Sequence, residues 1–185
     1  VGALVGLAGA DDAPQREQAC GALRMLAHEC DDNAAAIMRD PSAPPSLLLA
    51  ASSGTYDALL QALALVAELT RPRAGPDEDG DMRAVFRRQA LGQDAALDAI
   101  VRALSLGTTE VKVQAALCLR NAFVPPPAMD PGRVPAGVVG TVVRVLKDSG
   151  GSVRLRVLDA LRALCHDPRK RREVGALAGV YSSIG

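Results

Sequence analysis

The stretch AALCLRNAF, from Ala115 to Phe123, decides the fold, because three other stretches of the chain share its pattern. These are ACGALRMLA from Ala19, LLQALALVA from Leu59 and VLDALRALC from Val157. In all four, positions 1, 4, 5, 8 and 9 are small or apolar, which is the spacing of a helix with one buried side. The fifth position is leucine in every case. The sequence therefore predicts four equivalent helices.

The spacing of these helices predicts a repeat. The four stretches start 40, 56 and 42 residues apart, and two of these intervals are close to the period of about 40–47 residues found in helical repeat proteins. The long interval contains RPRAGPDEDGD, from Arg71 to Asp81, whose Pro, Gly and acidic residues predict an inserted loop. A second apolar stripe recurs with the same period of 42 residues: Leu97, Ile100, Val101 and Leu104, then Val139, Val142, Val143 and Leu146.

The run A-x-x-A-L-x-x-L-A, followed by a polar turn with Asn33 and an apolar residue such as Ile37, resembles the armadillo repeat. The HEAT repeat is the alternative, because its period is similar. The resemblance implies an all-α, right-handed superhelical solenoid of about four armadillo-like repeats, whose third helices line a concave groove for extended partner segments. The units of this single array over residues 1–185 would span approximately 1–40, 41–81, 82–133 and 134–173, with a further unit starting at 174–185.

One motif recurs near the two ends of the chain. The motif VGAL occurs at Val1 and recurs at Val174, so we expect the array to be truncated at both ends and the chain to be a fragment.

Pro41, Pro44 and Pro45 precede the second repeated stretch. Because proline disrupts a helix interior, they predict that the helix there is limited to about SLLLAASS.

Positions 3, 6, 7 and 10 of each repeated helix point away from the core on a helical wheel. Asn121 occupies position 7, so we expect it on the open face. Armadillo proteins that bind peptides repeat Asn at this position and Trp at position 3, so the resemblance implies that Asn121 contacts a guest backbone. The chain has no Trp, which argues against transport of nuclear localisation signals. The candidate partner-binding residues on this concave face are Arg24, Met25, His28, Gln61, Leu117, Arg120, Asn121, Arg162 and His166.

Arginine recurs on the open face, at Arg24, Arg120 and Arg162, with His28 and His166 one turn beyond the first and last. Guanidinium groups make bidentate hydrogen bonds to carboxylate and phosphate, so this column predicts an acidic or phosphorylated partner segment. The alternative is an ordinary solvated surface, because Arg is a good helix former.

Composition and charge exclude several function classes. Lys and Arg number 21, as do Asp and Glu, so no overall charge favours nucleic acid or an anionic membrane. No apolar stretch reaches the roughly 20 residues of a membrane span. The cysteines lack CxxC spacing, which predicts free, mostly buried thiols and an intracellular, cytoplasmic location, with nuclear or ciliary placement as alternatives. These cysteines are Cys20, Cys30, Cys118 and Cys165.

No catalytic constellation is visible in the sequence. The two histidines each have a cysteine nearby, but the pairs lie about three repeats apart, which is too far for a shared metal ion. No glycine-rich nucleotide motif occurs. We therefore expect no catalytic residue, cofactor, metal or small-molecule substrate. The basic run PRKRRE, from Pro168 to Glu173, is compatible with a localisation signal or an acidic-partner patch, but favours the solvated first helix of the next unit.

These observations predict a non-enzymatic scaffold or adaptor that binds a partner protein along the concave face of an armadillo-like array. Three alternatives stay open. The chain could be the substrate-recognition segment of a larger enzyme such as a ubiquitin ligase, an Hsp70 nucleotide-exchange cofactor, or a structural component of a cytoskeletal or ciliary assembly.

Overall fold

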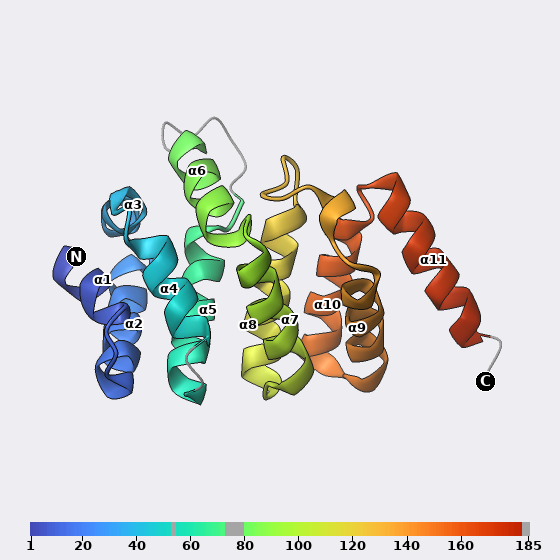
Figure 1. Ribbon diagram of the computed structural model, residues 1–185, viewed down its shortest axis with the longest axis horizontal. Coiled ribbons are helices and arrows are strands. Elements are labelled where there is room, and N and C mark those ends of the chain that lie inside the picture. Colours follow the sequence, from blue (N-terminus) through green and yellow to red (C-terminus); the bar gives the residue numbers. More distant parts are fainter. Residues whose placement is uncertain (53–54, 73–79, 183–185) are drawn as a thin grey trace. The chain divides into compact units, whose positions relative to one another are not determined.

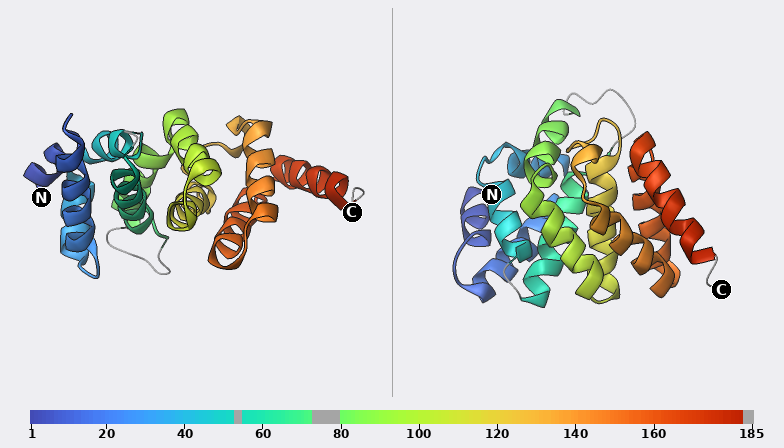
Figure 2. Two further views of the ribbon diagram at one scale, coloured as in Figure 1. Left: turned by 90° about the horizontal axis from the view of Figure 1, so that it is seen from below. Right: turned by 45° about the vertical axis from the view of Figure 1, so that its right-hand side comes forward.

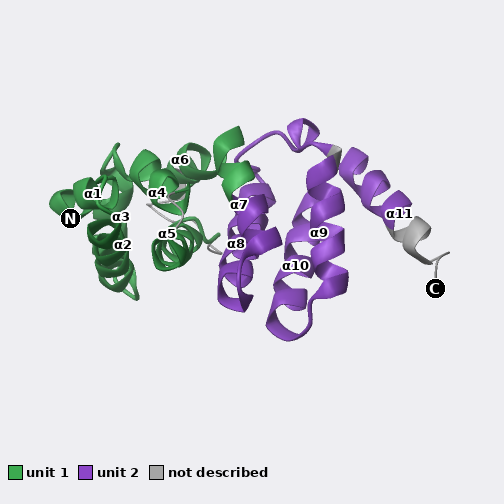
Figure 3. Cartoon of the chain, turned by 60° about the horizontal axis from the view of Figure 1, so that its bottom comes forward, with its two compact units in different colours: residues 1–99 green, residues 100–185 purple. Residues whose placement is uncertain are grey.

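The computed structural model describes residues 1–52, 55–72 and 80–182, and every regular element within these ranges is helical (Figure 1). The chain divides into two compact units, unit 1 at residues 1–99 and unit 2 at residues 100–185 (Figure 3). Helix α7 (Asp94–Leu106) begins in unit 1 and ends in unit 2.

Unit 1 is built around the packing of two repeated helices, α2 on α5, which lie side by side in Figures 1 and 2. Helix α1 packs on α2, and α4 packs on α5, so the shorter helices cover one side of this pair. Leu23 of α2 and Leu63 of α5, the leucines at position 5, are buried as predicted. Besides the start of α7, the described helices of unit 1 are α1 (Gly2–Ala8), α2 (Ala13–Ala27), α3 (Asp31–Arg39), α4 (Ala43–Ser52), α5 (Tyr56–Leu69) and α6 (Gly80–Leu91).

Unit 2 repeats this arrangement with α8 packed on α10. Leu119 and Leu161, again at position 5, are buried; α9 packs on α10, and α11 packs mainly on α9. Position 4 holds Cys118 and Ala160, whose small side chains let the two helices approach closely. The elements of unit 2 are α8 (Thr109–Phe123), the 3₁₀ helix η1 (Pro131–Arg133), α9 (Ala136–Asp148), α10 (Gly151–Leu164) and α11 (Pro168–Ser182).

Local signals define several helix ends. Asp12 accepts a hydrogen bond from the backbone N–H of Gln15 at 3.0 Å and caps the start of α2. At the other end of α2, the side-chain amide of Asn33 donates to the carbonyl of Leu26 at 2.9 Å. Asn33 lies in the first turn of α3, so a side chain of the next helix satisfies one of the free carbonyl groups at the end of α2.

The prediction for α4 was wrong at its start. This helix begins at Ala43 and includes Pro44 and Pro45, where the sequence predicted a helix limited to about SLLLAASS. Both prolines lie in the first turn, where the backbone N–H groups have no partner within the helix and their loss costs little.

The predicted limits of the buried stripe were also wrong at two positions. Position 7 was expected at the solvent, yet Leu65, Asn121 and Ala163 are all buried, and Asn121 is only 1% exposed. Met25, the fourth member, is 66% exposed, and Leu26 at the supposedly buried position 8 is 37% exposed. A wheel treats each helix alone, whereas the packing of one repeated helix on another covers residues at the flank of the open face.

The predicted loop from Arg71 to Asp81 falls mainly outside the described residues, which omit 73–79; α6 begins at Gly80. In the part of the chain that the structure describes, no helix combines the length and apolar character needed to cross a bilayer.

Candidate interaction pockets at the helix ends

A pocket lies in unit 2 between the carboxyl-terminal end of α8 and one face of α10, and we call it the unit 2 pocket. It is open to solvent and has a volume of about 330 Å³. Two residues from α8 and its end, and five from α10 and its end, form its lining. They are Arg120, Val124, Arg156, Asp159, Arg162, Ala163 and His166.

The three guanidinium groups of the unit 2 pocket have different partners. Arg156 Nη1 lies 3.4 Å from Asp159 Oδ2, so these two side chains form an ion pair. Arg120 Nη1 donates to the side-chain oxygen of buried Asn121 at 3.3 Å. Arg162 is exposed. With His166 counted as neutral, three cations and one carboxylate give the pocket a formal charge of +2.

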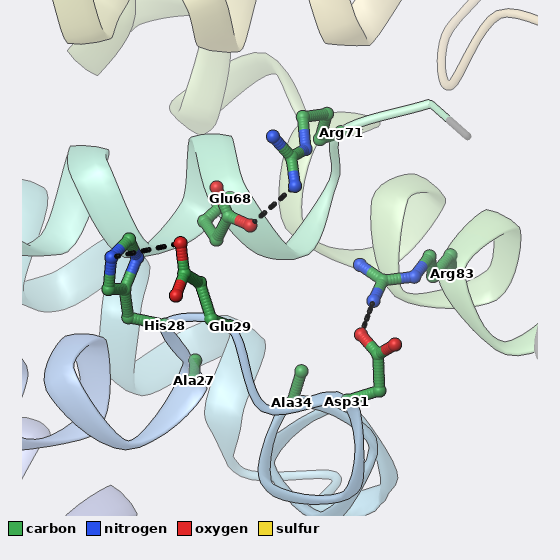
Figure 4. A pocket seen from close by; sticks show the side chains of 8 residues that line it. All are labelled: Ala27, His28, Glu29, Asp31, Ala34, Glu68, Arg71 and Arg83. Carbon is green, nitrogen blue, oxygen red and sulfur yellow. Dashed lines mark ion pairs between the residues drawn. The ribbon is translucent and has the colours of Figure 1, made fainter. Parts of the chain in front are cut away.

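A second pocket, the unit 1 pocket, lies at the corresponding place where α2 and α5 end (Figure 4). It is smaller, with a volume of about 120 Å³, and α3 and α6 contribute to it. Three carboxylates and two guanidinium groups give it a formal charge of −1 when its histidine is neutral. Its lining residues are Ala27, His28, Glu29, Asp31, Ala34, Glu68, Arg71 and Arg83.

The cations of the unit 1 pocket are bound by its own carboxylates. Arg71 Nη2 lies 3.0 Å from Glu68 Oε1, and Arg83 Nη2 lies 3.5 Å from Asp31 Oδ1, as Figure 4 shows. Arg83 also donates through Nη1 to the carbonyl of Leu69 at 3.2 Å, and its side chain is only 12% exposed. The contacts of Arg83 tie α6 to α3 and α5, whereas the pair of Arg71 with Glu68 is local to the end of α5.

The structure brings three of the nine predicted site residues together, namely Arg120, Arg162 and His166 in the unit 2 pocket. Asn121 lies next to this group, buried and bonded to Arg120. Leu117 is half-buried on α8. In unit 1, the structure places His28 in the unit 1 pocket, while Arg24, Met25 and Gln61 lie outside its lining.

Sequence reasoning missed Arg156, although a signal for it was present. Arg156, Asp159, Ala163 and His166 follow the i, i+3, i+7, i+10 spacing of one helix face, so extending the open face by one turn finds it. The unit 1 pocket offered no comparable signal. Asp31 and Arg83 come from helices far apart in the sequence, and only the packing of α3 on α6 brings them together.

The cysteines have no part in either pocket lining. None of the four forms a disulfide; Cys20 and Cys118 are buried, while Cys30 and Cys165 are half-buried. Burial raises the pKa of the Cys118 thiol to about 12 and that of Cys20 to about 11, so both stay protonated at neutral pH and are poor nucleophiles. Within the described residues, no three His, Cys, Asp or Glu side chains gather in a way that could hold a metal ion.

The basic run from Pro168 to Glu173 forms the start of α11, which the sequence favoured. Lys170 in the middle of this run is only 6% exposed. Its ammonium group donates to the carbonyl of Val134 at 2.5 Å and to Glu173 at 2.8 Å. Because one of its cations is buried and bonded, the run does not present a continuous basic motif to a receptor.

Solved structures share this arrangement of helices. A protein described as "Designed armadillo repeat protein YIII(Dq)4CqI" aligns with 95% of this chain and 69% of its own length, at a TM-score of 0.72 and 16% identity. The chain has the armadillo-repeat fold. The predictions of an armadillo-like family resemblance and of an all-α repeat solenoid are therefore confirmed.

Two more solved structures align with most of the chain. An engineered protein of the Northeast Structural Genomics Consortium aligns with 96% of this chain and 68% of its own, at a TM-score of 0.73 and 20% identity. A designed armadillo repeat protein, described as in complex with the peptide (KR)4, covers 95% of this chain and 69% of its own, at a TM-score of 0.72 and 14% identity. No protein-family model matches the chain, and neither does any curated protein sequence.

Proposed function

We propose that this chain is a non-enzymatic protein-interaction module that binds an acidic segment of a partner protein at the unit 2 pocket. One observation carries the proposal. Arg120 and Arg162 project from neighbouring repeated helices into one solvent-open pocket, and neither is bound to a carboxylate there. Arginine in this setting binds carboxylate or phosphate groups through paired hydrogen bonds.

The fold supports a peptide as the ligand. A designed protein with the same fold is described as complexed with (KR)4, a basic peptide. The unit 2 pocket has the opposite charge preference, because its formal charge is positive. We therefore propose an acidic segment for this chain, with Leu117 of α8, which is half-buried in the same unit, as a further contact.

The helix ends offer a competing explanation for the two arginines. Both lie in the last turn of their helix, where a cation is favoured by the negative end of the helix dipole. This effect is worth about 0.3–1 kcal/mol at an exposed site, and it does not require two arginines to share a pocket. A binding experiment separates the two explanations, since a dipole effect changes stability without changing partner binding.

The experiment is site-specific photo-crosslinking in cells. A benzophenone amino acid replaces His166, at the exposed edge of the pocket, and in a matched chain replaces Arg144, which is exposed on α9. We expect the first chain to capture a protein, and the crosslinked peptide mapped by mass spectrometry to be acidic. The second chain should not capture it.

Charge reversal then tests the arginines. Arg120→Glu with Arg162→Glu should reduce capture by about tenfold or more. The attraction between these two guanidinium groups and the carboxylates of the partner becomes a repulsion between carboxylates. The matched variant, Arg144→Glu with Arg154→Glu, reverses two exposed arginines of unit 2 outside the pocket lining and should leave capture unchanged. Circular dichroism must show equal helicity for both. Equal loss in the two variants, or a crosslinked peptide that is basic, would refute the proposal.

A further inference from the structure

The unit 2 pocket has more positive charge than an acidic side chain can neutralise. Asp159 is paired with Arg156 at 3.4 Å, so the guanidinium groups of Arg120 and Arg162 remain, with a summed charge of +2. A glutamate or aspartate of a partner has one negative charge and two acceptor oxygens. If such a residue occupied the pocket, one of the two guanidinium groups would remain without a countercharge.

A phosphate monoester matches this pocket better than a carboxylate does. It has a charge of about −1.5 to −2 at pH 7 and three strong acceptor oxygens. Each guanidinium group has five N–H donors in a planar fork, so two of them on neighbouring helices can bind separate phosphate oxygens. The pocket volume of about 330 Å³ leaves room for a phosphorylated side chain.

One of the two cations is already oriented. Arg120 donates to the side-chain oxygen of Asn121, and Asn121 is buried in the body of α8. Holding a long side chain in place before binding reduces the entropy lost when the ligand arrives. Arg162 is exposed and can move to meet the ligand from the α10 side.

We propose that the unit 2 pocket is a phosphate-binding site for a phosphoserine or phosphothreonine of a partner protein, so that partner binding is switched on by phosphorylation. This inference rests on the proposed function and adds the chemical class of the bound residue. The protein source of the phosphate is favoured over nucleic acid and membrane lipid for one reason. The whole chain has 21 basic and 21 acidic residues, whereas a nucleic acid or an anionic bilayer is bound through an extended basic surface.

The test is an array of peptides synthesised in matched sets. Each set has the same flanking sequence and differs only at its central residue, which is serine, phosphoserine, glutamate or lysine. Binding of the full chain is read by fluorescence. We expect phosphoserine peptides to bind about tenfold or more tightly than their glutamate partners, because phosphate has the larger charge and the additional acceptor.

Two single substitutions locate the effect. Arg162→Met removes one pocket cation and should reduce the preference for phosphoserine over glutamate to about twofold or less. Arg154→Met, on the same helix but outside the pocket lining, should leave the preference unchanged. Inorganic phosphate should compete with the phosphopeptide, while sodium chloride at equal ionic strength should compete less.

The outcomes distinguish this inference from the proposed function. Equal binding of glutamate and phosphoserine peptides, both lost in Arg120→Glu with Arg162→Glu, overturns the phosphate inference and leaves the proposed function standing. Absence of binding to any acidic peptide overturns both. Two other phosphate sources are tested in the same way. One is a vesicle that contains phosphatidylinositol phosphate, and the other is a single-stranded oligonucleotide. If either binds through Arg120 and Arg162 more tightly than the phosphopeptides do, the phosphoprotein partner is refuted.

Discussion

The two pockets occupy equivalent places in the two units and use charge in opposite ways. In the unit 1 pocket, Arg71 and Arg83 are each paired with a carboxylate of the same unit. In the unit 2 pocket, Arg120 and Arg162 are not paired with a carboxylate, and only Arg156 is. Arginines that line equivalent pockets can therefore be part of the packing or be left for a ligand. The difference depends on whether neighbouring helices supply acidic side chains.

The largest expected effect concerns Lys170, a charge of unit 2 that is buried and paired within its own unit, as Arg83 of unit 1 is. Lys170→Met removes the donor to the Val134 carbonyl and leaves Glu173, which is only 24% exposed, without its ion-pair partner. We expect it to reduce the stability of α11 by about 3 kcal/mol. Hydrogen exchange of the α11 amides measures this, because α11 can open locally at the end of unit 2.

Two control variants accompany Lys170→Met. Arg169→Met changes an exposed cation of the same helix and should have an effect within about 0.5 kcal/mol. Adding Glu173→Leu to Lys170→Met should restore part of the stability, because the unpaired carboxylate is then absent. If Lys170→Met changes the stability of α11 no more than Arg169→Met does, the buried lysine does not stabilise the helix. The view that a buried, paired cation is part of the packing would then be wrong for unit 2.

A direct comparison of the pockets comes from removing one arginine from each. Arg83→Met removes the bond to the Leu69 carbonyl and the ion pair with Asp31, so we expect unit 1 to lose about 1–3 kcal/mol. Arg162→Met removes an exposed side chain and should change stability by less than about 0.5 kcal/mol. Urea unfolding followed by circular dichroism measures both. Equal effects of the two substitutions would show that the distinction between the pockets is wrong.

The smallest expected effect concerns the backbone at the unit 1 pocket. Glu29 has φ of 54°, in the left-handed region where a Cβ atom is disfavoured. Glu29→Gly relieves this strain and should raise the free energy of unfolding by a few tenths to about 1 kcal/mol, after the greater chain entropy of glycine is subtracted. Glu29→Ala is the matched control, because it removes the same carboxylate and keeps Cβ. A gain in stability with Ala equal to that with Gly would assign the effect to charge.

Much of the fold follows from local pattern. Leu23, Leu63, Leu119 and Leu161 could be recognised as core residues, because a small residue before each leucine and apolar residues a turn away define a buried helix side. The period between these helices then indicated the repeat. The candidate site was predictable only in part, since the spacing along α10 selects Arg162 and His166 but does not show their neighbours across the pocket.

The sequence by itself determined which helices repeat and which side of each is buried, because side-chain periodicity is a property of one helix. Only the tertiary structure decided whether a polar residue beside the buried stripe of a helix is buried, paired or exposed. Asn121 is buried and holds Arg120, where a wheel placed it at the solvent. Asp31 neutralises Arg83 because α3 packs on α6, while Arg162 meets no carboxylate partner in its pocket. Charge pairing depends on distances of a few ångströms between helices far apart in sequence, and such distances exist only after packing.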